Sequence, residues 1–346
     1  MLFRSRGPVP TTRYRLVTPL ARALADRIRH DGPLGVEAYM AACNDYYYAT
    51  RDPLGAGGDF TTAPEIHQMY GEMIGAALAD TWVRAGRPDG VRYAELGPGR
   101  GTLAADALRV MAAAGCVPAS VELVETSPVL RATQSEKLPR AIFHDEIAGL
   151  ADGAGPLLVV ASEFFDALPV RQFVGERERH LILAAGGFAF DRDGEVIERS
   201  PVREGAVAAL ATLLLDKGGA AILIDYGHDR EGAAGDTLQA VHAHRFAYVL
   251  DRPGEQDLTA HVDFAALARV ATASGAKVSR AVSQGSWLET LGIGARAIAL
   301  AASNPAETDA IAVARRRLCD DDQMGRLFKV MAIRSRDWPN VAGLAS

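Results

Sequence analysis

Cysteine is scarce in this sequence, and the few cysteines present exclude two kinds of stabilisation. The 346 residues include three cysteines, Cys43, Cys116 and Cys319, and no Cys-x-x-Cys pair. An odd number without that spacing indicates neither a disulfide framework nor a zinc site. This low cysteine content favours a protein of a reducing compartment.

Long apolar runs and an excess of positive charge are also lacking. Apolar runs such as residues 157–161 and 220–224 are far shorter than the roughly 20 residues that a membrane helix needs. The formal net charge is −6, so the chain has no overall basic field to hold a nucleic-acid backbone. The sequence therefore predicts neither a membrane span nor a nucleic-acid partner.

The N-terminal segment, residues 1–17, is expected to be a basic tail. It contains no acid and carries four arginines, Arg4, Arg6, Arg13 and Arg15. This composition is typical of a mitochondrial transit peptide, but Pro8, Pro10 and Pro19 interrupt any amphipathic helix. The ordinary tail of a bacterial protein is therefore favoured, with a cytoplasmic location. A targeting peptide for the mitochondrial matrix is the alternative.

Residues 18–90 are expected to form a helical N-terminal cap region. Apolar residues recur there at spacings of three and four in two stretches that both end at glycine. Between them, residues 46–62 are aromatic and glycine-rich without any period, which favours a substrate or cofactor loop. The loop ends in Thr62-Ala-Pro-Glu65, a capping-box pattern. Glu65 is interpreted either as a helix cap or as a charge in a pocket.

Residues 91–346 alternate between short β-rich runs and helical stretches. This alternation predicts an α/β fold in which crossover helices cover both faces of a mostly parallel, Rossmann-like sheet. Three insertions are expected to interrupt it: a small antiparallel inset at 170–199, a strand-poor connection at 227–262 and helices at 286–318. The length of 346 residues fits either about two domains or one large α/β domain with insertions.

A glycine turn, Glu95-Leu-Gly97-Pro98-Gly99-Arg-Gly101, follows the first predicted strand of this region and opens a helix. Its backbone N–H groups are expected to face a ligand above the carboxyl edge of the sheet. The glycines are spaced Gly-x-Gly-x-Gly, whereas a dinucleotide fingerprint reads Gly-x-Gly-x-x-Gly. Glu95 would repel a pyrophosphate but would attract an ammonium group.

Two more acids follow the next two predicted strands. Glu125 stands where an acid accepts both hydroxyls of an unphosphorylated ribose, and Asp145 is expected within reach of an adenine amino group. A ligand with a cationic amino-acid end, a free ribose diol and adenine is S-adenosylmethionine. The pattern favours a methyltransferase over a nicotinamide enzyme, although each acid taken alone is also explained as a solvated strand end.

Seven blocks of sequence resemble one known family in their order, within a match that runs from about residue 20 to residue 333. The blocks are GDFTTAPEIHQMYGEMIG, AELGPGRGTLAADALR, VELVETSPVLRATQ, SEFFDALPVRQFV, DTLQAVHAHRF, GEQDLTAHVDFAALA and MGRLFKVMAI. Together they resemble the MidA-like family of S-adenosylmethionine-dependent methyltransferases. The eukaryotic members of that family are mitochondrial arginine methyltransferases needed to assemble respiratory NADH dehydrogenase.

The resemblance implies a class I methyltransferase fold, S-adenosylmethionine as cofactor, and a partner protein that presents an arginine, such as a respiratory-complex subunit. Two positions depart from the family pattern. Ser162 stands where asparagine is expected, and His67 stands where serine is expected. The first departure weakens any role for an amide at that position.

The chemistry is assigned to Ser162-Glu163-Phe-Phe-Asp166, which follows the fourth strand and faces the transferred methyl group in this architecture. A guanidinium pairs bidentately with a carboxylate, so an acid here would orient an arginine and localise its charge on one nitrogen. Glu163 is the first candidate and is also expected to contact the cofactor. Asp166 and Asp59 are further catalytic candidates, and Asp166 has the alternative role of capping the following turn.

Tyr226 and His228 end the fifth strand at the same sheet edge and are weaker pocket candidates. His242, His244 and His261 lack the spacing of metal ligands, so no metal is expected. Two other functions remain open, a methyltransferase acting on a small molecule and a non-catalytic assembly factor that retains the fold.

Overall fold

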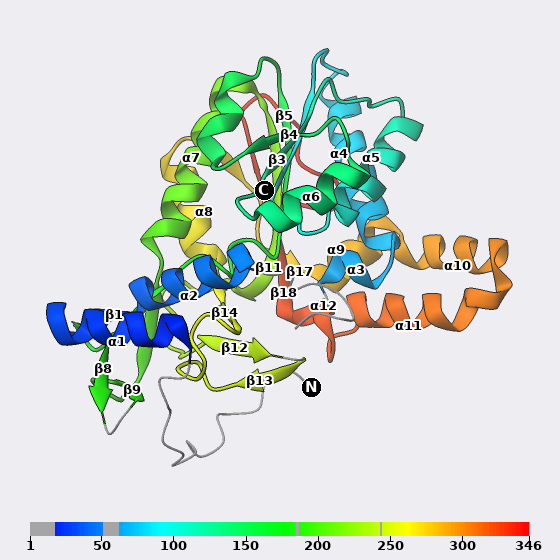
Figure 1. Ribbon diagram of the computed structural model, residues 1–346. Coiled ribbons are helices and arrows are strands. Elements are labelled where there is room, and N and C mark those ends of the chain that lie inside the picture. The colour runs from blue at the N-terminus through cyan, green and yellow to red at the C-terminus, as the bar shows by residue number, and fades with distance from the viewer. Residues whose placement is uncertain (1–17, 51–61, 185–186, 243, 346) are drawn as a thin grey trace.

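The structure, a computed structural model, describes residues 18–50, 62–184, 187–242 and 244–345 (Figure 1). At its centre lies a sheet with the strand order β4-β3-β2-β5-β11-β18-β16, while β15 pairs with β11 and β17 with β18. Neighbouring strands from β4 to β11 run parallel, and β18 is antiparallel to β11. The mostly parallel α/β sheet predicted from the sequence is confirmed.

The strands of this sheet are β2 (Arg92–Leu96), β3 (Val121–Val124), β4 (Ile142–His144), β5 (Leu157–Ser162), β11 (Gly219–His228), β15 (Val262–Asp263), β16 (Lys277–Val278), β17 (Val282–Ser283) and β18 (Phe328–Arg334). The helices that accompany it are α5 (Thr102–Ala113), α6 (Pro128–Lys137), the 3-10 helix η1 (Ile147–Asp152), α7 (Pro201–Lys217), α8 (Phe264–Ala273), α9 (Gln284–Leu291) and α12 (Met324–Leu327).

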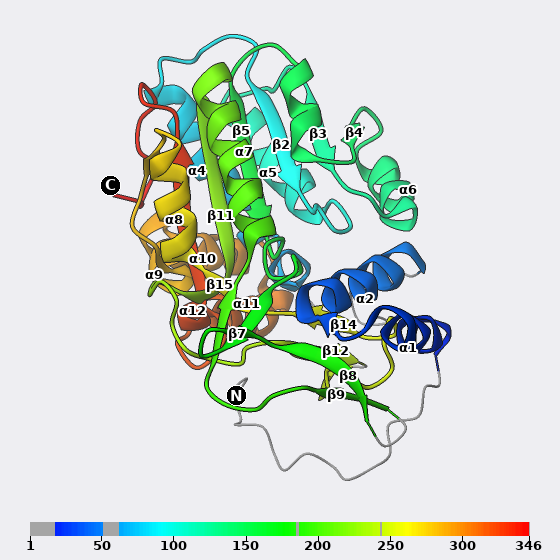
Figure 2. The same ribbon diagram turned by 90° about the vertical axis from the view of Figure 1, so that its left-hand side faces the viewer.

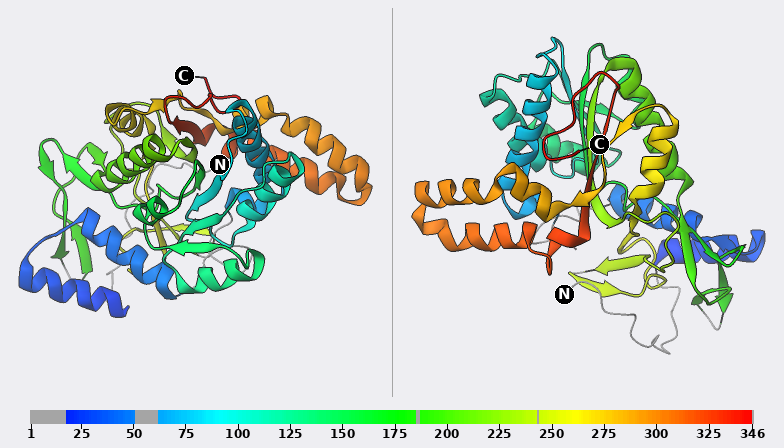
Figure 3. Two further views of the ribbon diagram at one scale, coloured as in Figure 1. Left: turned by 90° about the horizontal axis from the view of Figure 1, so that it is seen from above. Right: turned by 180° about the vertical axis from the view of Figure 1, so that it is seen from behind.

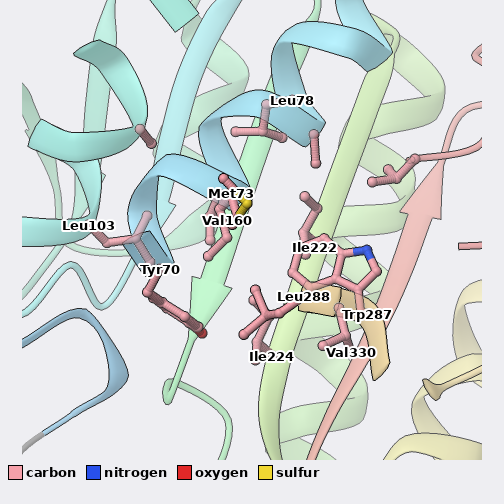
Figure 4. Packing of buried hydrophobic residues seen from close by; sticks show 14 of the residues in the cluster. Tyr70, Met73, Leu78, Leu103, Val160, Ile222, Ile224, Trp287, Leu288 and Val330 are labelled. Atoms are coloured by element: carbon pink, nitrogen blue, oxygen red, sulfur yellow. The ribbon is translucent and has the colours of Figure 1, made fainter. Parts of the chain in front are cut away.

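Helices cover both faces of the sheet (Figure 2). Side chains alternate along β11, so Ala220, Ile222 and Ile224 are buried in one core with α5 and with the N-terminal helix α4 (Met69–Arg84). Ala221 and Leu223 are buried in a second core with α7 and α8. Figure 4 shows the first core, with Ile222 and Ile224 beside the side chains of α4. Because both faces are buried, the strands read as continuous apolar runs in the sequence.

The N-terminal region is described as α1 (Pro19–Asp31), α2 (Val36–Thr50), α3 (Ala63–Ile66) and α4 (Met69–Arg84). Helix α2 continues through residues 46–50, which were expected to belong to the loop, because Tyr47 is fully buried there. The remainder of that predicted loop, residues 51–61 with Asp59, lies outside the described residues. So does the predicted basic tail, residues 1–17.

Helix α4 packs closely on α5 at a glycine. A Cβ atom on Gly75 would come within 2.5 Å of the carbonyl oxygen of Ala107, so only glycine permits this approach of the two backbones. The first helical layer of the sheet therefore includes a helix from the N-terminal region.

Residues 170–199 form antiparallel strands in two small sheets, ordered β10-β6-β7 and β1-β8-β9. These strands are β1 (Leu34–Gly35), β6 (Arg171–Val174), β7 (Arg177–Glu178), β8 (His180–Ala184), β9 (Gly187–Phe190) and β10 (Val196–Arg199).

The expectation that residues 227–262 are poor in strands was wrong. An antiparallel sheet forms there from β12 (Gln239–His242), β13 (Arg245–Ala247) and β14 (Asp257–Thr259). These strands are too short to show a period, and Ala240 and Leu258 are buried in a core shared with α1 and α2. Tertiary packing therefore stabilises strands that local sequence does not indicate.

Helices α10 (Ile293–Ser303) and α11 (Thr308–Cys319) project from the body as a hairpin (Figure 3). The buried carboxylate of Glu72 in α4 anchors the hairpin, because it accepts a hydrogen bond from Arg296 of α10 at 2.7 Å. The same carboxylate accepts a hydrogen bond from Arg109 of α5 at 3.1 Å. Within the described ranges, no helix combines the length and the apolar character needed to cross a bilayer.

Candidate cofactor and catalytic site

A cavity of about 800 Å³ lies at the carboxyl edge of the parallel strands. Predicted site residues from four strand ends line it together: Glu95, Gly97, Pro98, Gly99, Glu125, Asp145 and Glu163. Tyr48 of α2 and Glu65 of α3 also line the cavity. The predicted residues Gly101 and Asp166 are described but are not among the lining residues.

The glycine turn adopts backbone angles that favour glycine at each of its three glycines. The φ angles of Gly97, Gly99 and Gly101 are +63°, +54° and +73°. A Cβ on Gly97 would lie 2.9 Å from the ring of Phe164, so space as well as backbone angle requires glycine there. Gly101 is the N-cap of α5, which explains why it borders the helix rather than the cavity.

Glu95 presents a buried carboxylate from β2. Its Oε2 accepts a hydrogen bond from the Tyr93 hydroxyl at 2.6 Å. Burial raises the pKa of Glu95 to about 8, and the hydrogen bond from Tyr93 opposes that rise. A cation placed in the cavity would stabilise the ionised carboxylate, so this position suits an ammonium group.

Glu125 follows β3 and is oriented by two donors. The Ser127 N–H donates to Oε1 at 2.8 Å, and the Gln134 side-chain amide donates to Oε2 at 3.3 Å. Gln134 also donates to the Gly99 carbonyl at 2.6 Å, which ties the acid to the glycine turn. Burial raises the pKa of Glu125. Sequence reasoning did not identify Gln134.

Arg131 holds the ends of β3 and β4 together, and sequence reasoning missed it as well. Its guanidinium donates to the carbonyls of Glu125 at 2.6 Å and His144 at 3.0 Å, and to the Asp145 carboxylate at 2.7 Å. The Asp145 side chain is 83% exposed, so it stands at the rim of the cavity. A contact between Asp145 and adenine stays a prediction.

Glu163 follows β5 in a conformation that few residues other than glycine adopt. Its φ is +54°, and its Oε1 accepts a hydrogen bond from the Ala63 N–H at 2.7 Å, so one carboxylate oxygen is fixed by the start of α3. Burial raises the pKa of Glu163 to about 8. The negative charges of Asp166 and Asp257 add to that rise, and Arg317 opposes it.

Asp166 lies deeper, behind the cavity wall. The Tyr226 hydroxyl is hydrogen-bonded to its carboxylate, and burial raises the pKa of Asp166. Tyr226 therefore contacts the loop that follows β5 and does not line the cavity. His228 lies farther away still, with His261 in a second cavity of about 380 Å³.

The capping box predicted at Thr62 and Glu65 does not form. The Thr62 side chain makes no capping hydrogen bond. Instead, Glu65 accepts a hydrogen bond from the Thr102 hydroxyl, which also accepts one from Lys137 at 2.7 Å. Thr102 is the first residue of α5, so this tertiary contact draws Glu65 away from its own helix and to the cavity wall.

Comparison with known proteins identifies the family of this chain. A family model described as "Putative S-adenosyl-L-methionine-dependent methyltransferase" matches residues 73–187 and 180–282. The mitochondrial protein arginine methyltransferase NDUFAF7 of Mus musculus is 32% identical, over 92% of this chain and 84% of that protein. This chain belongs to the MidA-like family of S-adenosylmethionine-dependent methyltransferases. The Homo sapiens relative of the same name is also 32% identical, over 92% of this chain and 83% of its own length.

A crystal structure of a Burkholderia thailandensis protein bound to S-adenosyl-homocysteine has the same fold, with a TM-score of 0.82 and 27% identity. The match covers 94% of this chain and 93% of that one. The donor set of the cavity is chemically compatible with S-adenosylmethionine, because the lining carboxylates of Glu95 and Glu125 can accept hydrogen bonds from an ammonium group and from ribose hydroxyls. We expect Glu95 to hold the ammonium group, Glu125 the ribose and the turn at Gly97 and Gly99 the backbone of the methionine portion.

Replacement of Glu125 with alanine should weaken binding of S-adenosylhomocysteine by about 1–3 kcal/mol, roughly ten- to a hundredfold, because two ribose hydroxyls lose their acceptor. Titration calorimetry measures the effect. Asp145→Ala is the matched control at the next strand end, and its smaller loss is expected because that side chain is exposed. Tighter binding of NADH than of S-adenosylhomocysteine by the unmodified protein would contradict the assignment of Glu125.

Proposed function

We propose that this methyltransferase modifies an arginine of a partner protein. The observation that carries the proposal is the placement of Glu163, a cavity-lining carboxylate with one oxygen held by the Ala63 N–H at 2.7 Å. A guanidinium is the cationic nucleophile that a carboxylate binds and orients by paired hydrogen bonds. The printed names of the mouse and human relatives, protein arginine methyltransferases, support the same substrate class.

S-adenosylmethionine supplies an electrophilic methyl group on sulfur when it is bound. In the proposed reaction, the ionised Glu163 carboxylate pairs with the substrate guanidinium and localises positive charge away from the attacking nitrogen. The nitrogen–methyl bond forms as the sulfur–methyl bond breaks, and the guanidinium loses one proton. Residues of α2 and α3 that line the cavity, among them Tyr48 and Glu65, limit the access of water.

The partner that we propose is a respiratory-complex subunit, the class implied by the family resemblance, with the modification taking place in the cytoplasm of a bacterial source. The mouse and human relatives are named as mitochondrial. A eukaryotic source would place the reaction in the mitochondrial matrix.

Methyl transfer should depend on the ionisation of Glu163. The pKa of Glu163 is raised to about 8, so below that pH the carboxyl is mostly protonated and cannot pair with a guanidinium as an anion. With cofactor saturating, kcat/KM for the acceptor should rise about tenfold per pH unit below that value and level off above it. A pH profile that is flat between 6 and 8, or unchanged in Glu163→Gln, would contradict this role.

The substrate class is tested with deuterium-labelled S-adenosylmethionine. The purified protein is incubated with total protein from cells that lack its gene, and the protein is hydrolysed for amino-acid mass spectrometry. Labelled methylarginine is the expected product. Label recovered in a small molecule of the soluble extract, with none in protein, would instead favour the small-molecule methyltransferase. Cofactor binding without any methyl release would favour the non-catalytic assembly factor.

A further inference from the structure

The loop after β5, residues 163–168, carries Glu163 and Asp166 and is held from two sides by buried side chains of other elements. These are Asp225 of β11 and Arg203 of α7, which are 1% and 3% exposed. Neither side chain lines the cofactor cavity, and neither takes part in the proposed methyl-transfer step.

Asp225 binds the loop through its backbone N–H groups. Oδ2 of Asp225 accepts hydrogen bonds from the N–H groups of Phe165 at 2.9 Å and of Asp166 at 3.1 Å. Its Oδ1 accepts the N–H of Tyr226 at 3.0 Å. The two bonds to Oδ2 fix the backbone two and three residues after Glu163, the residue with a φ of +54°.

Arg203 binds the same loop through its carbonyl groups. Its guanidinium donates to the carbonyls of Asp166 at 3.0 Å and Leu168 at 3.2 Å. It also donates to the carbonyls of Ala260 at 3.1 Å and His261 at 2.6 Å. One side chain thus joins the catalytic loop to the segment that follows β14.

That second segment reaches the cofactor cavity from another direction. Asp257 opens β14, and its Oδ1 accepts a hydrogen bond from the hydroxyl of Tyr48, a cavity-lining residue. The Ala260 N–H donates to the Asp166 carbonyl at 3.0 Å, which adds a direct link between the two segments. The loop that carries Glu163 and Asp166 and the segment that carries Asp257 are therefore joined by hydrogen bonds of their backbones.

We infer that Asp225 and Arg203 are positioning residues that hold Glu163 in its productive orientation toward the substrate. Two buried charges are costly compared with an apolar pair of similar volume, so stability alone does not explain them. Their hydrogen bonds converge on the loop that carries the catalytic carboxylate, which is where precise placement affects rate. This inference rests on the proposed function of Glu163.

The test compares Asp225→Asn and Arg203→Met with Arg92→Met. Arg92 is a matched control, because it is also buried and donates to the Leu150 carbonyl at 3.0 Å and to the Glu122 carboxylate at 3.0 Å. It begins β2 opposite Leu157, at the other end of the parallel strands from Glu163. Asp225→Asn keeps the shape of the side chain but replaces one of its two accepting oxygens with an NH2 group, which cannot accept either the loop N–H groups or the N–H of Tyr226. It therefore weakens the hold on the loop in a variant expected to fold even if Arg203→Met does not.

Both site variants should lose on the order of 10²-fold in kcat for methylarginine formation, measured with labelled S-adenosylmethionine and protein from cells lacking the gene. Their Kd for S-adenosylhomocysteine should change by less than about threefold. Amide hydrogen exchange at residues 165 and 166 should accelerate in both, and Arg92→Met should change neither kcat nor this exchange.

Methyl transfer at the unmodified rate in Asp225→Asn and Arg203→Met would overturn the inference. Unchanged exchange at residues 165 and 166 would overturn it as well, and this readout needs no substrate. Absence of methylarginine with the unmodified protein would contradict the proposed function instead, while the exchange data would still decide whether the two side chains hold the loop.

Discussion

Replacement of Glu163 with glutamine should remove most methyl transfer and leave cofactor binding unchanged. The amide keeps the shape of the side chain and its carbonyl oxygen can still accept the Ala63 N–H, which lies 2.7 Å from Oε1. The negative charge that orients the guanidinium is lost, however, so kcat should fall on the order of 10²- to 10³-fold. Single-turnover methyl transfer and calorimetry with S-adenosylhomocysteine measure the two effects separately.

Glu198→Gln is the control for Glu163→Gln. Glu198 is also a buried glutamate whose pKa burial raises, but its carboxylate accepts hydrogen bonds from Thr237 and Gln172, away from the cofactor cavity. This control should methylate at the unmodified rate. If Glu163→Gln did so too, the orienting role would pass to Asp166 or to Asp59.

Replacement of Gly99 with valine should abolish cofactor binding. A β-branched side chain resists the φ of +54° at this position and would fill the space where the backbone lines the cavity. We expect the affinity for S-adenosylmethionine to fall by more than about a hundredfold, which corresponds to about 2.7 kcal/mol. Titration calorimetry measures the loss.

Gly115→Val is the control for Gly99→Val, because it introduces the same backbone strain at a glycine outside the cavity. Gly115 has a φ of +79° and nothing within 4 Å of an added Cβ, and it does not line the cavity. It should lose stability comparable to that of Gly99→Val and still bind the cofactor. Equal calorimetric binding by Gly99→Val and the unmodified protein would refute the role of the glycine turn.

The positions of the cavity-lining residues at the strand ends were predictable because they follow from strand order. Parallel strands bring their carboxyl ends to one edge of the sheet. Once the alternation of strands and helices is recognised, the acids at the strand ends are therefore predicted to lie together: Glu95, Glu125, Asp145 and Glu163. A family resemblance added the substrate class. It did not add the orientation of any side chain.

Residues that act through tertiary contacts were not predictable. Arg131, Asp225 and Arg203 hold loops that are distant in sequence, and no local pattern distinguishes them from ordinary charged residues. The failed capping box has the same cause, since the Glu65 carboxylate accepts a hydrogen bond from Thr102, which is distant in sequence. Residues 46–50 were expected to be loop because their helical pattern is weak. Burial of Tyr47 stabilises the helix there in spite of that pattern.

The account is tested most directly by mass spectrometry of methylarginine in the source cell. Three strains are compared: the unmodified strain, a strain that lacks this gene, and one that carries Glu163→Gln at the natural locus. We predict at least one arginine of a cellular protein that is methylated in the unmodified strain and unmethylated in the other two. An identical set of methylarginines in all three strains would contradict the claim that this methyltransferase modifies protein arginine.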